Sequence, residues 1–221
     1  RMPTAFVTAL ALLALARFAT ADDLPRANRA LLYLGLALGL GLGHHPSLVF
    51  PGVFFVLYVL LIDPRLVLQP NRWWRAIAAG LVGFLPYVYL PIAAARGAPL
   101  APPGLTTLPG FVHHVLARGF GGDMFAYATM NDLPNRLALL QTLFPFQFNA
   151  ALLVAAGLGV LLLLWQDWRL FVLLVGSVLL HTFVAITYRA PQTVEYLMPA
   201  YLPIAVMVGL VPVVARRVLQ L

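Results

Sequence analysis

The chain has 221 residues, of which 62% are hydrophobic and only 10% charged, whereas a soluble globular domain carries about 25% charged residues. A soluble protein this apolar could not cover its surface with polar groups, so we expect lipid to be the solvent for much of that surface. The net charge of +7 comes from Arg residues scattered between apolar runs, which is unlike the basic stripe of a nucleic-acid-binding protein, and the absence of Cys excludes disulfides and thiolate metal sites.

The start of the chain lacks the pattern of a cleaved signal peptide. Such a peptide has a basic region, a short apolar core and a small-residue cleavage site. Here Arg1-Met2-Pro3 leads directly into an apolar stretch. We therefore expect a fragment that begins at or inside a membrane helix, with the N-terminal part of the protein missing.

Long apolar runs recur along the chain. Backbone groups in lipid must bond internally, so each run predicts a helix, and a crossing needs about 20 residues or fewer where the bilayer thins. The pattern predicts an all-α, polytopic integral membrane protein with about seven transmembrane helices, at residues 3–16, 30–43, 47–62, 76–95, 150–165, 170–186 and 199–215. The first three runs are short and could be partly re-entrant. Gly35, Gly39 and Gly43, spaced four apart, predict close helix packing.

These runs suggest three regions: helices 1–4 in residues 1–95, an extracytoplasmic loop in 96–149 and helices 5–7 in 150–221. With alternating spans, nine Arg residues fall on one side (17, 26, 29, 65, 72, 75, 169, 216 and 217) and four on the other (96, 118, 136 and 189). The positive-inside rule makes the first side cytoplasmic, and the four Trp residues fall there as an interfacial belt. Arg without Lys favours a GC-rich bacterial genome, hence the bacterial inner membrane, with any chemistry on the extracytoplasmic face.

Residues 96–149 form the one long connection between the predicted spans. Its opening, Pro99 to Pro109, is too rich in Pro for regular helix. Residues 110–120 and 133–148 then predict short amphipathic helices at the outer membrane surface. His114 and Arg118, four residues apart, would share one helical face. Two interpretations stay open for them, a solvated polar face or a clamp for a phosphate or diphosphate, which the guanidinium fork of Arg fits well.

The His-His pairs His44-His45 and His113-His114 raise the question of a metal site. Adjacent residues on a helix point about 100° apart, so each pair offers one ligand to a shared site more easily than two. The chain has no HExxH motif, no P-loop and no GxSxG or GxGxxG motif. We therefore expect neither a metal nor a cofactor.

Three stretches in this order resemble a known family. They are GLGHHPS at residues 41–47, LPYVYLP at 85–91 before the Pro-rich loop, and Tyr188-Arg189 followed by EYLMPA at 195–200. The order resembles bacterial membrane proteins of a family of uncharacterised function that also includes a protein O-mannosyltransferase of the eukaryotic endoplasmic reticulum. That family in turn resembles the glycosyltransferase C superfamily. The resemblance covers most of residues 1–200.

The resemblance implies a membrane glycosyltransferase that moves a sugar from a polyprenyl-phosphate donor to an acceptor protein or glycan on the extracytoplasmic face. It places the catalytic base in an outer loop before Arg1; within the chain, the candidates are Asp123 and Glu195, and Gln192 stands where the family often has an acidic residue. The candidate substrate-binding residues are His44, His45, His114, Arg118, Arg189 and Tyr196. The alternatives are a transporter or flippase of a lipid-linked substrate and a non-catalytic membrane scaffold.

Overall fold

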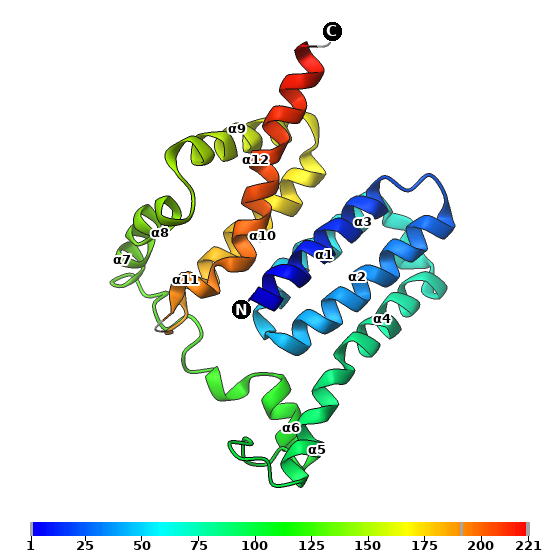
Figure 1. Ribbon diagram of the computed structural model, residues 1–221, viewed down its shortest axis with the longest axis vertical. Helices are drawn as coiled ribbons and strands as arrows, with labels where there is room; N and C mark the ends of the chain where they lie inside the picture. Colours follow the sequence, from blue (N-terminus) through cyan, green and yellow to red (C-terminus); the bar gives the residue numbers. More distant parts are fainter. Residues whose placement is uncertain (1, 191, 220–221) are drawn as a thin grey trace. The chain divides into compact units, whose positions relative to one another are not determined.

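A computed structural model describes residues 2–190 and 192–219, and every regular element in this part of the chain is a helix (Figure 1). The predicted all-α fold class is therefore confirmed. The chain divides into two compact units, the first formed by Arg1–Val49 and Ile62–Gly122, the second by Phe50–Leu61 and Asp123–Leu221.

Unit 1 contains three long helices, followed by short helices in the Pro-rich region. Its elements are α1 (Met2–Ala19), α2 (Leu24–His44), the 3-10 turns η1 (Pro46–Leu48) and η2 (Pro64–Leu68), α4 (Pro70–Phe84), η3 (Leu85–Val88), α5 (Tyr89–Ala95), α6 (Leu108–Val115) and η4 (Arg118–Phe120). Helix α2 packs against both α1 and α4. Asp23 caps the start of α2 by accepting a hydrogen bond from the backbone N–H of Arg26 at 2.7 Å.

The glycine spacing in α2 matches a close helix contact. A Cβ placed on Gly35 would meet the carbonyl oxygen of Ala76 in α4, and one on Gly39 would meet that of Gly80. The two helices run in the same direction, because Asn28 near the start of α2 bonds Arg72 near the start of α4. The predicted close packing is confirmed at Gly35 and Gly39, where only glycine lets the two backbones approach.

Arg72 ties the starts of α2 and α4 to the preceding turn. Its guanidinium donates to Asn28 Oδ1 at 2.7 Å, Asp63 Oδ2 at 2.7 Å and Gln69 Oε1 at 2.8 Å. The Arg72 side chain is only 11% exposed. A cation this far from solvent depends on its carboxylate partner, so the network fixes this end of unit 1.

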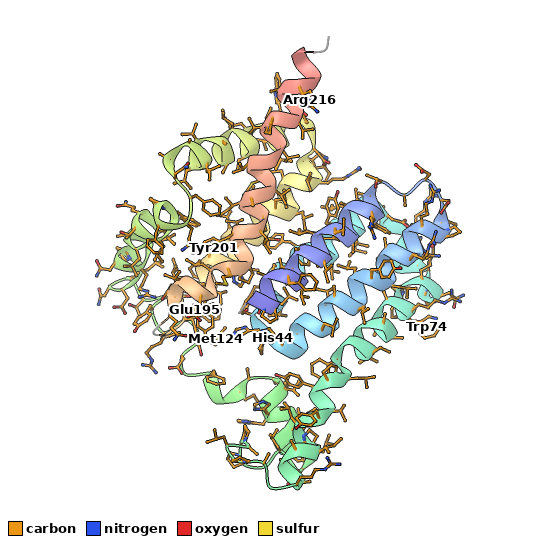
Figure 2. All side chains as sticks on the ribbon, viewed as in Figure 1. His44, Trp74, Met124, Glu195, Tyr201 and Arg216 are labelled. Carbon is orange, nitrogen blue, oxygen red and sulfur yellow. The ribbon has the colours of Figure 1, made fainter. Side chains whose placement is uncertain are left out.

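Unit 2 contains four longer helices and three short ones. They are α3 (Val49–Ile62), α7 (Leu133–Ala138), α8 (Leu140–Gln147), α9 (Ala150–Gln166), α10 (Trp168–Thr187), α11 (Thr193–Tyr196) and α12 (Met198–Leu219). Helix α12 packs against α9 and α10, and a Cβ on Gly159 of α9 would meet the carbonyl oxygen of Met207 in α12. Figure 2 shows Glu195 and Arg216 toward opposite ends of the α11–α12 stretch.

Three helical stretches in the described part of the chain are long and apolar enough to cross a membrane: Pro70–Ala95, Trp168–Thr187 and Met198–Arg216. A fourth crossing is added if Leu133–Gln147 and Ala150–Gln166, which are bent by 110°, act as one span. Only 6% of the apolar window of Pro70–Ala95 is buried against protein, so its remaining surface suits lipid.

The prediction of seven transmembrane helices is not supported. The apolar helices Pro3–Ala19 and Pro46–Ile62 have at most 17 residues, fewer than the about 20 that a crossing needs. Helix α2 has 21 residues, but Arg26, Asn28 and Arg29 occupy its first two turns and leave too short an apolar stretch. Counting apolar runs gave more spans than the helix lengths support, because a run can be apolar without being long enough to cross.

Candidate functional site

Polar side chains gather in unit 2 where α10 ends. Arg189, two residues beyond the helix, directs its Nε and Nη2 atoms to Asp123 Oδ1, each at 2.8 Å. The backbone N–H of Arg189 also donates to the Asp123 carbonyl at 3.0 Å, and Tyr127 donates its N–H to the Thr187 carbonyl at 3.0 Å. Two segments far apart in sequence are thus held together, with the Arg189 side chain 59% exposed.

Arg136 on α7 joins the same region. Its Nε donates to the carbonyl oxygen of Ile186 at 2.6 Å, and its Nη2 donates to Thr193 Oγ1 at 3.0 Å. Its guanidinium also lies 4.6 Å from the centroid of the Tyr127 ring. Because the last carbonyls of a helix lack partners within it, a cation there stabilises the end of α10. Sequence reasoning treated Arg136 only as an orientation signal; partners 50 and 57 residues away leave no local pattern that could have revealed this role.

A hydrogen bond from His181 of α10 holds the backbone at Tyr196. The carbonyl oxygen of Tyr196 accepts a hydrogen bond from His181 Nε2 at 2.7 Å, so this ring nitrogen carries the proton. His181 is only 2% exposed, and the ring of Phe50 lies 6.4 Å from its ring. The ring of Tyr196 meets that of Tyr188 edge-on, with centroids 5.2 Å apart. His181 therefore positions the backbone around Tyr196.

The candidate carboxylates Asp123 and Glu195 both belong to unit 2. Asp123 is held against Arg189, and Glu195 lies on α11 directly before Tyr196. Helix α11 is attached to the end of α10 through Arg136 of α7, which donates to both Thr193 and the Ile186 carbonyl. The cations and carboxylates of this cluster thus occur together beyond the end of a helix that could cross a membrane.

The histidine candidates belong to unit 1. His44 is the last residue of α2 and is exposed, whereas His45 caps the following turn, its Nδ1 2.8 Å from Ser47 Oγ and 3.3 Å from the backbone nitrogen of Ser47. His114 lies with its ring 6.2 Å from that of Tyr87. A Cβ on Gly43, directly before His44, would lie 3.5 Å from Tyr87 as well. The last turn of α2 and helix α6 therefore both lie beside Tyr87.

Arg118 does not share a helical face with His114. Helix α6 ends at Val115, and Ala117 has a left-handed backbone with φ 51° before the 3-10 turn that begins at Arg118. The predicted amphipathic helix exists, but it is shorter than expected. The expected spacing of one helical turn between the two side chains is therefore wrong. The second predicted helix, at 133–148, is present as α7 and α8.

The structure thus brings Arg189 together with Asp123 and attaches the neighbourhood of Tyr196 to the end of α10. The candidates His44, His45, His114 and Arg118 lie in the other unit.

Within residues 2–190 and 192–219, no group of three or more His, Cys, Asp or Glu side chains is arranged to hold a metal ion. Comparisons with protein families, curated proteins and solved structures found no match to the chain.

Proposed function

We propose that the chain is part of a membrane glycosyltransferase that takes a sugar from a polyprenyl-phosphate donor. The observation that carries the proposal is the Arg189–Asp123 pair just beyond the end of α10, a helix long and apolar enough to cross a membrane. A guanidinium at this level suits the phosphate of a lipid whose polyprenyl tail stays in the hydrocarbon, and the exposure of Arg189 leaves room for such a ligand.

In the proposed reaction, the acceptor hydroxyl oxygen forms a bond to the anomeric carbon of the sugar as the bond from that carbon to the phosphate oxygen breaks. The electron pair leaves with the polyprenyl phosphate, and the hydroxyl proton passes to a general base. Arg189 stabilises the charge that develops on the departing phosphate. Asp123 holds the Arg189 guanidinium, Arg136 and His181 position the surrounding backbone, and Glu195 is the candidate base within this chain.

We further propose that this cluster faces away from the cytoplasm of a bacterial inner membrane. Support comes from the candidate spans, since Arg72 and Arg75 lie in the first turns of Pro70–Ala95 and Arg216 is the last residue of Met198–Arg216. In unit 1, Arg17, Arg26 and Arg29 line one pocket, and Asn28 beside them bonds Arg72, so these cations share one end of the unit. In unit 2, Arg169 begins α10, while Arg189 follows its other end.

The test compares Arg189→Ala with Arg169→Ala, a matched variant at the opposite end of α10. In the whole protein, reconstituted in proteoliposomes, we expect Arg189→Ala to lower kcat/KM for a purified polyprenyl-phosphate sugar by roughly ten- to a hundred-fold, from the loss of one charge-assisted contact. Arg169→Ala should have little effect. Arg189→Lys should recover part of the rate, because a point charge lacks the guanidinium fork.

Asp123→Asn separates a role in catalysis from a role in folding. The amide keeps a hydrogen-bond acceptor for Arg189, so we expect a smaller loss of rate than with Arg189→Ala. Equal losses in Arg189→Ala and Arg169→Ala at matched amounts of folded protein would refute the phosphate contact. Equal losses in Asp123→Asn and Arg189→Ala would make the pair a structural tie.

A further inference from the structure

A second basic site lies in unit 1, where α1 turns into α2. A cavity of about 390 Å³ is lined by Arg17, Thr20, Ala21, Asp22, Arg26, Arg29, Ala30 and Tyr33. Three Arg and one Asp in the lining make the cavity basic. None of these residues belongs to the cluster in unit 2.

The three arginines of this cavity differ in their partners. Arg26 Nη1 lies 2.8 Å from Asp22 Oδ2, and Arg26 Nε lies 3.5 Å from Asp23 Oδ2, so two carboxylates already balance Arg26. Within the described part of the chain, Arg17 and Arg29 have no carboxylate partner. Two exposed guanidinium groups that no carboxylate of the described residues balances thus line one cavity.

The remaining lining residues indicate how such an anion would be held. Tyr33 lies one helical turn after Arg29, so its hydroxyl can donate to a ligand that Arg29 also contacts. Asp23 already accepts the backbone N–H of Arg26 at the start of α2, so we assign the contacts with the anion to side chains. Two guanidinium groups can bind more oxygens on a phosphate than on a carboxylate, so phosphate is the better matched anion.

We infer that this cavity, which we call the Arg17–Arg29 pocket, binds the phosphate group of an anionic ligand. An anionic lipid headgroup and a soluble phosphate compound would both present this chemistry. The site does not depend on glycosyl transfer, since it belongs to the other unit and needs none of the residues of the proposed reaction.

The experiment measures binding by calorimetry to the detergent-solubilised whole protein. The probes are dihexanoyl phosphatidic acid, inorganic phosphate and, as a zwitterionic control, dihexanoyl phosphatidylcholine. We expect saturable binding of the phosphatidic acid that Arg17→Gln and Arg29→Gln each weaken by about tenfold. Arg29→Lys should weaken it less. Arg65→Gln is the matched control, because Arg65 is an exposed arginine of the same unit outside the pocket.

Thermal unfolding of each variant shows whether it is folded, and Arg29→Lys keeps the test valid if a Gln variant is not. Binding of phosphatidic acid alone would identify a lipid headgroup as the ligand. Comparable binding of inorganic phosphate would identify a soluble phosphate, and either result supports the pocket. Failure of both anionic probes to bind, or equal weakening by Arg65→Gln and Arg29→Gln, would overturn the inference.

Discussion

Replacing Gly39 with Ala should separate α2 from α4. The added Cβ would fall on the carbonyl oxygen of Gly80, a backbone atom that no side-chain rotation can move, so the helices must shift apart. Forcing extra volume into a packed contact costs about 1–3 kcal/mol. Ala also favours helix over Gly by about 1 kcal/mol, which would mask part of that cost. Gly157→Ala in α9 provides the same gain without the clash, since nothing lies within 4 Å of its Cβ position.

The difference between these two variants isolates the packing term. We expect Gly39→Ala to have a free energy of unfolding about 1–3 kcal/mol below that of Gly157→Ala, measured by titration with SDS in mixed micelles. Gly43→Ala should resemble Gly157→Ala, because its Cβ would sit 3.5 Å from Phe84 and Tyr87, an ordinary contact. Agreement of Gly39→Ala and Gly157→Ala within about 0.5 kcal/mol would refute the close α2–α4 contact.

Three further predictions follow from the charged residues. Arg72→Met should lower the free energy of unfolding by about 2–4 kcal/mol in the same titration, because it leaves the carboxylate of Asp63 without its cation. The matched control, Arg65→Met at an exposed arginine, should change it by less than about 0.5 kcal/mol. Arg136→Met should speed amide hydrogen exchange at the end of α10, where its guanidinium binds the last turn; unchanged exchange would contradict that role. A reporter fused after Arg72 should read cytoplasmic and one within Pro99–Pro109 extracytoplasmic, and both on one side would contradict the proposed orientation.

Much of the helical framework could be predicted from local pattern. Long apolar runs predict helices because lipid leaves backbone groups no other partner, and glycines four apart predict the face where α2 meets α4. Asp23, Asn149 and Asp167 each cap the start of a helix that follows in the sequence. These features depend on neighbours in the sequence, so the sequence contains their cause.

The site depended on contacts that no local pattern contains. Asp123 and Arg189 are 66 residues apart, and Arg136 reaches a backbone carbonyl 50 residues away. The helical spacing expected between His114 and Arg118 failed because Ala117 adopts a left-handed backbone, which side-chain pattern at a non-glycine residue does not predict. The prediction of seven spans is not supported because several apolar runs form helices too short to cross a membrane, and apolar composition alone does not fix where a helix begins and ends.

The central claim is transfer of a sugar from a lipid-linked donor, and its most direct test follows the donor itself. The whole protein in proteoliposomes is supplied with a purified polyprenyl-phosphate sugar and an acceptor, and both products are quantified by chromatography. The account predicts that polyprenyl phosphate is released in equal amount to the sugar transferred, and that Arg189→Ala suppresses both. Movement of an intact donor across the bilayer would instead identify a flippase. An unchanged donor that stays in its leaflet would contradict the proposed enzyme.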